Sequence, residues 1–243
     1  MNSKPIQTAS IQSSQCSIID LGLRDYQEIL ELQRSLCRAR IVGRECRDLL
    51  LLVEHPPVVT LGRGTKSTSL PIPPEQLTSH GFEVIEVERG GDVTIHEPGQ
   101  LVGYPIIDLN HHRRDLHWYL RQLEEVLIRA LAALDISAAR NPGLTGVWTQ
   151  GRKIASIGIH VKQWVTYHGF ALNVVNDLTG FERVVPCGIS GVTMTSVLRE
   201  LPSPRQEHLS AVWKMAKSAV IDAMGEVFEL TPVVVPESSL TVR

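Results

Sequence analysis

Residues 146–174 read GVWTQGRKIASIGIHVKQWVTYHGFALNV, and this stretch decides the fold class. It alternates in polarity, is rich in β-branched residues, and has short polar breaks at 150–152 and 162–163. Alternation with a period of two is typical of strands, and short polar breaks are typical of tight turns. The stretch therefore predicts a three-stranded antiparallel meander. Such a meander among helices favours an α+β architecture over a doubly wound parallel sheet.

Helical periodicity flanks this meander on both sides. Leucines recur every three or four positions across 115–134, where Asp115 is placed to cap the first turn, and apolar residues recur similarly across 206–228. A third helix is expected over 24–40. We predict mixed and antiparallel sheets with packed helices. Strands are expected at 17–21, at 82–91, at 101–109 and in two runs within 50–62 that His55-Pro56-Pro57 interrupts. A long surface loop is expected over 62–80.

The composition is that of an ordinary globular chain. Its 243 residues, 43% of them hydrophobic, are enough to bury a substantial core. We expect one catalytic domain over 18–230, a disordered tail over 1–17, which is rich in Ser and Gln, and a C-terminal tail over 231–243. No apolar run approaches the roughly 20 residues that a membrane span needs.

Charge and cysteine content exclude several classes of function. A net charge of −2, from 24 basic and 26 acidic side chains, provides no field that would hold a nucleic acid. The four cysteines are widely scattered and form no C-x-x-C pair, which favours reduced thiols in a cytoplasm. Any one of these thiols is then free to be reactive.

The loop at 89–100, RGGDVTIHEPGQ, is rich in glycine and contains a single histidine, His96. Glycine permits close approach to bare backbone, so the loop is expected to receive a ligand. Neither glycine-rich nucleotide motif is present, and no helical pattern follows, which argues against a phosphate cradle. A bulged hairpin with a structural His96 is an equally good interpretation.

Two residues could supply nucleophilic chemistry. Cys187 lies between Pro186 and Gly188, before a short helix expected from Thr193, so it occupies a turn whose amides could lower a thiol pKa and bind an oxyanion. A buried cysteine is more often a small hydrophobe. Lys153 shares an apolar strand face, where it either extends to water or is buried and exchanges protons near neutral pH. A Cys/Lys pair would supply nucleophile and general acid–base for acyl transfer.

The remaining histidines and arginines carry weaker signals. His111, His112 and His117 stand among arginines at a polar helix entrance without any recognisable ligand spacing, so we expect solvated surface and no metal. Six arginines are candidates for a basic docking face, although ordinary solvated arginines explain them equally well: Arg38, Arg40, Arg44, Arg47, Arg113 and Arg114.

Four segments in order, 50–64, 89–109, 146–174 and 186–197, closely resemble the lipoyl(octanoyl) transferases, the octanoyl-carrier-protein:protein octanoyltransferases of lipoate biosynthesis. The resemblance covers roughly 18–230. It implies an α+β domain related to the catalytic modules of biotin and lipoate ligases, without metal or nucleotide cofactor. A cytoplasmic monomer is expected.

The resemblance also implies roles for individual residues. Cys187 would accept the octanoyl group from acyl carrier protein as a thioester, and Lys153 would adjoin it and lower its pKa. The acyl group would then pass to a lysine ε-amine on a lipoyl domain of an oxo-acid dehydrogenase or of the glycine cleavage H protein. The substrate-contacting residues carried over are Arg89, Gly90, Gly91, Asp92, Val93, Thr94, Ile95, His96, Ser156, Ile157, Gly158, Gly169, Phe170 and Ala171.

The chain departs from the family in the same loop. Members commonly read Y-H-G-P-G-Q where this chain has Ile95 to Gln100, so an aromatic is lost and a glycine becomes Glu97. Val59 likewise replaces a frequent aromatic. A positive φ at position 97 would strain a glutamate by roughly 1–2 kcal/mol, whereas Pro98 favours an extended conformation that glutamate tolerates.

Two other functions remain open on the sequence. An ATP-dependent lipoate or biotin ligase would share the fold, but the G-R-G-R-x-G segment of biotin ligases is missing and Cys187 would have no purpose in such an enzyme. A non-catalytic lipoyl-domain binder would keep the fold and lose the Cys/Lys pair, both members of which are present here.

Overall fold

The computed structural model describes residues 15–185, 191–201 and 209–240. Eight strands within these ranges form one mixed sheet in the order β11-β1-β2-β6-β10-β9-β8-β7. The pairs β11–β1 and β1–β2 are parallel and the remaining pairs are antiparallel. The strands are β1 (Gln15–Leu23), β2 (Asp48–Glu54), β6 (Gln100–Ile106), β7 (Ala139–Asn141), β8 (Leu144–Thr149), β9 (Arg152–Lys162), β10 (Val165–Asn173) and β11 (Thr231–Val234).

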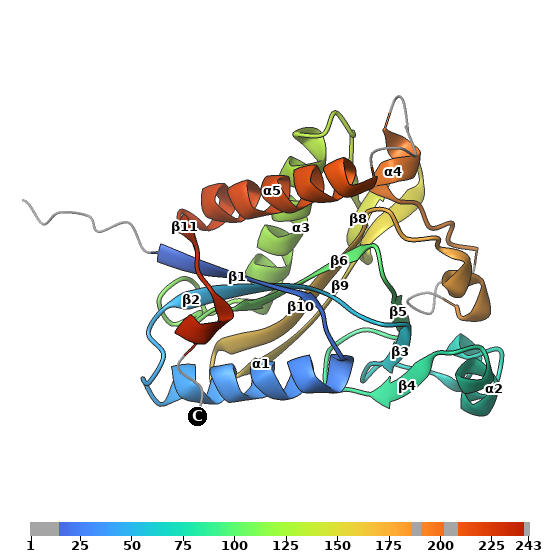
Figure 1. Ribbon diagram of the computed structural model, residues 1–243, viewed down its shortest axis with the longest axis horizontal. Helices are drawn as coiled ribbons and strands as arrows, with labels where there is room; N and C mark the ends of the chain where they lie inside the picture. Colours follow the sequence, from blue (N-terminus) through green and yellow to red (C-terminus); the bar gives the residue numbers. More distant parts are fainter. Residues whose placement is uncertain (1–14, 186–190, 202–208, 241–243) are drawn as a thin grey trace, which may run out of the picture.

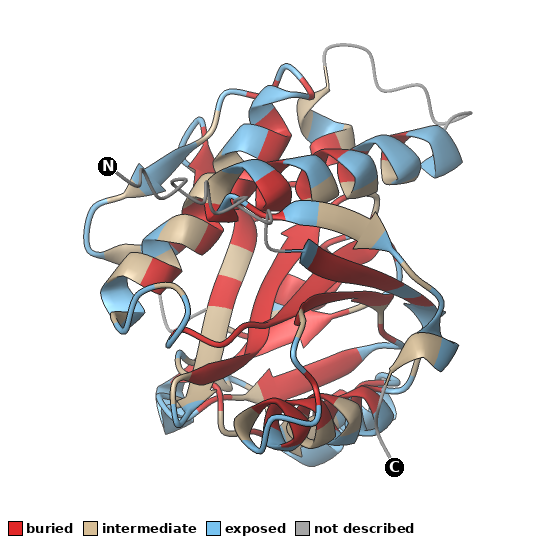
Figure 2. Ribbon diagram, turned by 90° about the vertical axis from the view of Figure 1, so that its left-hand side faces the viewer, coloured by how far each residue is buried: buried red, intermediate tan, exposed pale blue. Residues whose placement is uncertain are grey.

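Helices cover both faces of this sheet (Figure 1). Helix α1 (Tyr26–Ile41) packs on one face, while α3 (Leu116–Ala132) and α5 (Leu209–Phe228) pack together on the other. Figure 2 shows the central strands of the sheet buried and the helices exposed on their outer sides, and the buried central strands are β2, β6 and β10. Each face therefore has its own apolar core, and the sheet separates the two.

A smaller sheet lies beside the end of the large one. Its strand order is β4 (Glu83–Glu86), β3 (Val58–Leu61), β5 (Thr94–His96), and its apolar core includes Val59, Ile95 and Phe181. The shorter elements are α2 (Pro74–Ser79), α4 (Val197–Glu200) and 3₁₀ turns at Ser67–Ser69, Thr179–Arg183 and Glu237–Ser239.

The structure confirms the α+β class and the meander. Strands β8, β9 and β10 are consecutive and antiparallel, with Gly158 opposite Gly169. Their turns place Gln150-Gly151 and Gln163-Trp164 at positive φ, which is the geometry of two-residue hairpin turns. The three expected helices form within a few residues of their predicted bounds, and the Asp115 carboxylate caps α3 by accepting from Trp118 N at 3.0 Å.

Five expectations differ from the structure. Residues 231–234, assigned to a C-terminal tail, form β11 against β1, which itself begins at Gln15 rather than Ser17. The loop at 62–80 contains α2, the glycine-rich loop contains β5, and the helix expected from Thr193 begins at Val197. Apart from β1, these elements have three to six residues, and such short elements are stabilised by neighbouring strands rather than by a repeating local pattern.

None of the helices in the described ranges combines the length and the hydrophobicity that a membrane span requires.

Candidate active site

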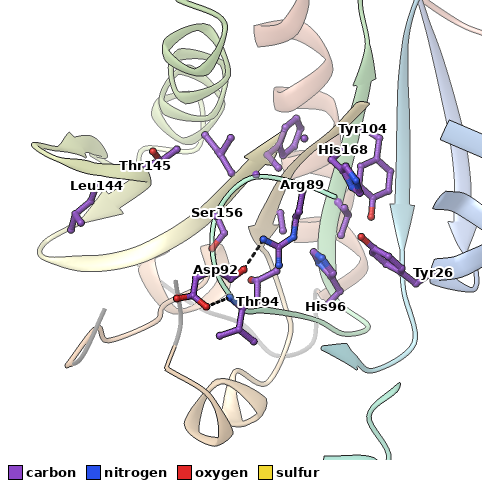
Figure 3. A pocket seen from close by; sticks show the side chains of 18 of the residues that line it. Tyr26, Arg89, Asp92, Thr94, His96, Tyr104, Leu144, Thr145, Ser156 and His168 are labelled. Carbon is purple, nitrogen blue, oxygen red and sulfur yellow. Dashed lines mark hydrogen bonds between the residues drawn. The ribbon is translucent and has the colours of Figure 1, made fainter. Parts of the chain in front are cut away.

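A cavity of about 250 Å³ lies on the α1 side of the large sheet, beyond the start of that helix. Its floor is formed by β6, β10 and β9, and the loop from Arg89 to His96 covers it. Figure 3 shows Leu144 and Thr145 at one end and a group of aromatic and imidazole side chains at the other. The lining residues are Tyr26, Arg89, Gly91, Asp92, Val93, Thr94, His96, Val102, Tyr104, Gly143, Leu144, Thr145, Ser156, Ile157, Gly158, His168, Gly169, Phe170 and Ala171.

Arg89 holds the covering loop in place. Its buried guanidinium donates to the carbonyl oxygens of Thr60 and Asp92, each at 2.7 Å. The next residue, Gly90, donates from its backbone N–H to Ile159 O on β9 at 2.8 Å. A Cβ at Gly158 would lie 2.8 Å from Gly90 O, so this glycine is required for the close approach of two backbones.

The far end of the cavity is polar and buried. His96 Nδ1 lies 2.7 Å from Gln100 Oε1, and the imidazole stacks on Tyr26 with ring centroids 5.7 Å apart. His55, behind it, makes a 2.9 Å hydrogen bond to the Tyr104 hydroxyl. Burial lowers the pKa of His96 to about 3 and the pKa of His55 to about 4. Both imidazoles are therefore neutral near pH 7, and a group as weakly basic as His96 is a wall residue rather than a general base.

His168 on β10 also lines the cavity. It is 1% exposed and has a positive φ of 56°. Within the described residues neither of its ring nitrogens has a hydrogen-bond partner, and Nε2 lies 3.9 Å from a carboxylate oxygen of Glu88. Burial lowers the pKa of His168, which keeps its imidazole neutral at pH 7.

Lys153, at the start of β9, is fully buried. Its Nζ donates to Thr145 O at 3.3 Å and lies 5.0 Å from the centroid of the Trp148 ring. The structure therefore selects the buried alternative for this lysine over extension to water. Because Thr145 lines the cavity, the ammonium group lies beside the cavity's wall.

Cys187 lies outside the described residues, but the chain on each side of it is placed. Val185 N donates to Ser69 O at 2.9 Å, and the Ser69 hydroxyl donates to the Asp92 carboxylate at 2.7 Å. On the other side, Thr193 O accepts from Lys153 N at 2.8 Å, and Thr195 N donates to Lys153 O at 2.9 Å. The segment before Cys187 thus contacts Ser69, which binds the cavity-lining Asp92. The segment after Cys187 pairs directly with the backbone of Lys153.

The structure brings most of the proposed substrate-contacting residues together around this cavity. All of them line it except Gly90, which docks on β9, and Ile95, whose side chain is buried in the core of the small sheet. Lining residues that the sequence did not indicate are Tyr26, Val102, Tyr104, Gly143, Leu144, Thr145 and His168. Only His168, adjacent to Gly169 in a segment already singled out, had a local signal.

Glu97 is unstrained. Its φ is not positive, so the left-handed strain that a glutamate would suffer at a glycine position is absent. The Glu97 carboxylate accepts from Asn176 Nδ2 at 2.9 Å and from Leu178 N at 3.3 Å, so it fastens the β5–β6 turn to the segment after β10. The positive φ in this turn belongs to Gly99, at 86°.

Two residues expected on solvated surface are largely buried. Asp48 accepts from Arg40 at 3.2 Å and pairs with His112 Nε2 at 2.7 Å, and the three side chains are between 5% and 13% exposed. The expectation of a solvated His112 and a docking Arg40 was therefore wrong, because tertiary packing brings both onto one buried carboxylate. The described residues hold no group of three or more His, Cys, Asp or Glu that could bind a metal.

Comparison with known proteins finds a matching family model and similar curated proteins. Residues 25–221 match the model of the lipoyl protein ligase A/B catalytic domain. The chain is 50% identical to an octanoyltransferase of Nostoc sp. over 215 residues, which is 88% of this chain and 93% of that protein. It is 48% identical to an octanoyltransferase of Synechocystis sp. over 216 residues, 89% and 91% of the two chains.

A solved structure supports the fold assignment. The bipartite lipoate protein ligase of Thermoplasma acidophilum, described together with its E2 lipoyl domain, superposes with a TM-score of 0.66. The two chains are 15% identical, and the alignment covers 92% of this chain and 88% of the other. At this identity the likeness concerns the fold alone.

The match to the lipoyl protein ligase A/B catalytic domain covers most of the chain, and the chain belongs to that family. Within the family it belongs with the octanoyltransferases, which are acyltransferases of lipoate biosynthesis.

Proposed function

We propose that this protein transfers an octanoyl group from octanoyl-acyl carrier protein to the ε-amine of a lysine on lipoyl domains, through a thioester on Cys187. Lys153 carries the proton in both steps. The observation that carries the proposal is the pairing of Lys153 with the chain that follows Cys187, beside a cavity that accommodates an alkyl chain.

In the first step, the Cys187 thiolate attacks the thioester carbonyl carbon of the donor. The new C–S bond forms, the bond to the carrier's sulfur breaks, and the Cys187 proton passes through Lys153 to the departing sulfur. Donor and intermediate are both thioesters, so the step needs alignment and a thiolate rather than ATP. A protonated amine beside the sulfur favours the thiolate, and this role falls to Lys153.

In the second step, the acceptor amine attacks the Cys187 thioester. The C–N bond forms, the C–S bond breaks, and the amine's proton returns through Lys153 to the Cys187 sulfur. The cavity holds the alkyl chain meanwhile, and burial contributes about 0.8 kcal/mol per methylene. Its lining on the sheet side combines apolar and small residues: Val102, Phe170, Ala171 and Ser156.

We propose lipoyl domains of oxo-acid dehydrogenases and the glycine cleavage H protein as acceptors, with the protein acting as a cytoplasmic monomer. The described ligase of Thermoplasma acidophilum has an E2 lipoyl domain as its partner, which supports an acceptor of this class. Arg40 is paired with Asp48, and Arg47 is paired with Glu45. Docking by basic side chains would therefore depend on the exposed arginines of the predicted docking face. The exposed members are Arg38, Arg44, Arg113 and Arg114.

Intact-mass spectrometry after mixing with octanoyl-acyl carrier protein tests the proposal. Wild type should form a hydroxylamine-labile octanoyl adduct, Cys187→Ser none, and Lys153→Ala should form it on the order of 10²-fold more slowly. Lys162→Ala, at the exposed far end of the same strand, is the matched control and should behave as wild type. Free octanoate with ATP should give no transfer. An adduct at full rate on Cys187→Ser would refute the mechanism.

A further inference from the structure

Glu124 is a buried acid that the proposed reaction does not use. It lies in α3 and is 1% exposed. Its Oε2 accepts from Arg140 Nε at 3.1 Å and from Arg121 Nη1 at 2.5 Å. Its Oε1 reaches the neighbouring strand and accepts from Gly146 N at 3.2 Å. One carboxylate oxygen is therefore committed to arginines and the other to the backbone of β8.

Glu124 and Lys153 form hydrogen bonds to the same peptide group. The N–H of the Thr145–Gly146 peptide donates to Glu124, and the C=O of the same peptide accepts from Lys153 Nζ at 3.3 Å. A hydrogen bond at one end of a peptide polarises the other end, so a carboxylate on the N–H makes the carbonyl oxygen a stronger acceptor. Glu124 is thereby linked to the Lys153 ammonium through one planar unit.

The position of this peptide group requires a glycine at residue 146. Gly146 has a φ of 130°, which side-chain-bearing residues rarely adopt. A Cβ at this position would lie 2.6 Å from Ala155 O and 2.9 Å from Lys153 Cε. The peptide therefore packs directly against the aliphatic stem of Lys153, and turning it would move both the carbonyl and the stem.

We propose that Glu124 is a positioning residue for the reaction: it fixes the Thr145–Gly146 peptide and so holds the Lys153 amino group in place against the Thr145 carbonyl oxygen. This inference rests on the proposed function of Lys153 and Cys187. Glu200, a second acid near the start of β9, accepts from Arg152 at 2.8 Å and from the Thr195 hydroxyl at 2.5 Å.

The test is the pH dependence of Cys187 alkylation by iodoacetamide, followed on the Cys187 peptide by mass spectrometry. Exposed Cys46 in the same chain serves as an internal reference thiol. Glu124→Gln removes the charge and cannot accept from both Gly146 and the arginines. We expect its alkylation midpoint to move to higher pH, with about tenfold slower reaction at neutral pH, because the Lys153 amino group is no longer held where it favours the thiolate.

Glu125→Gln is the matched control. Glu125 is the next residue of α3 and pairs with Arg129 at 3.1 Å and with Arg140 at 2.8 Å, but not with β8. It loses the same charge and should keep the wild-type midpoint. A Glu124→Gln profile that overlays wild type, or an equal shift in Glu125→Gln, would overturn the inference.

If Glu124→Gln does not fold, Glu124→Asp keeps the charge but withdraws it by one methylene, and a smaller shift in the same direction is expected. An unshifted profile in that variant would equally overturn the inference. Acylation of wild-type Cys187 by octanoyl-acyl carrier protein is measured alongside, and its absence would refute the proposed function instead.

Discussion

Lys153 shows how function and stability oppose each other at one residue. A fully buried lysine amino group loses its hydration, and the hydrogen bond to Thr145 O and the Trp148 ring contribute to offsetting that cost. An uncharged side chain of similar length at this position would avoid the desolvation while filling the same space.

We therefore predict that Lys153→Met folds at least as stably as wild type, with a free energy of unfolding equal or higher by up to about 2 kcal/mol. It should nevertheless form the octanoyl adduct as slowly as Lys153→Ala. The Ala variant leaves a cavity and should be less stable than the Met variant. Denaturant unfolding compares the three chains, and a Met variant that is the least stable of them would contradict the prediction.

The buried imidazoles make stability depend on pH. His55 has its pKa lowered to about 4 by burial, against an ordinary value of 6.5. Below pH 6.5, His55 is protonated in the unfolded chain but stays neutral in the folded chain. The free energy of unfolding therefore falls as the pH drops from 6.5 to about 4. The full loss from this one residue is roughly 3 kcal/mol, and none of it applies above pH 6.5.

His55→Asn should flatten this decline. Its stability at pH 7.5 will be lower, because the bonds to Arg24 O and the Tyr104 hydroxyl are weakened, but the difference between pH 7.5 and 4.5 should shrink. His80→Gln, at an exposed position, is the control and should keep the wild-type slope. Urea unfolding at several pH values measures this, and an unchanged slope in His55→Asn would count against neutral burial.

At the scale of elements, the β5–β6 turn is joined to the 3₁₀ turn at Thr179–Arg183 by one side chain. Glu97 supplies both hydrogen bonds, to Asn176 Nδ2 and to Leu178 N. Leu178 has a φ of 74°, which is unusual for a leucine. Without Glu97, the N–H of Leu178 would lose its hydrogen-bond acceptor. The contact links the small sheet to the chain that leads toward Cys187.

We predict that Glu97→Ala lowers the free energy of unfolding by about 1–2 kcal/mol, because two donors lose their acceptor. Glu97→Gln retains one acceptor oxygen and should lose less than half as much. Neither change touches the cavity lining, so the preference among acyl chain lengths should stay as in wild type. Thermal unfolding and acylation with donors of several chain lengths check both parts, and an altered length preference would show that the turn shapes the cavity.

At the scale of the whole molecule, one buried carboxylate ties three layers together. Asp48 lies on β2, Arg40 comes from α1, and His112 precedes α3, so the cluster joins helices on opposite faces through the sheet. Removing one partner from such a cluster leaves the others buried without full compensation.

Asp48→Asn should therefore lower the free energy of unfolding by roughly 3 kcal/mol. Glu226→Gln removes a carboxylate from the exposed pair with Arg129, whose side chains are 49% and 64% exposed, and should change stability by less than about 1 kcal/mol. Equal effects of the two substitutions would show that burial does not decide the strength of these pairs. Denaturant unfolding at neutral pH makes the comparison.

Much of the fold could be predicted because its elements have strong local patterns. The meander has alternating polarity and two-residue turns, and the main helices have long apolar repeats and, in α3, a capping aspartate. Strand β11 and helix α2 were missed because four to six residues carry too little periodicity to identify an element.

The candidate site could be predicted only in part, for the same physical reason. The segments around Arg89, Ser156 and Gly169 were identified through family resemblance, and the structure gathers them on one cavity. Tyr26 and Tyr104 have no local feature that distinguishes them from core aromatics. They reach the cavity only because α1 and β6 pack beside the covering loop.

The amino-acid sequence by itself determined the α+β class, the main helices, the meander and the family, because periodicity, turn residues and motif order are local properties of the chain. Only the tertiary structure decided that Lys153 is buried, that Glu97 is unstrained, that His112 and Arg40 share Asp48, and that Glu124 reaches Gly146. Each of these depends on contacts between separate elements. Burial and hydrogen bonding across such distances follow from packing, which no local pattern records.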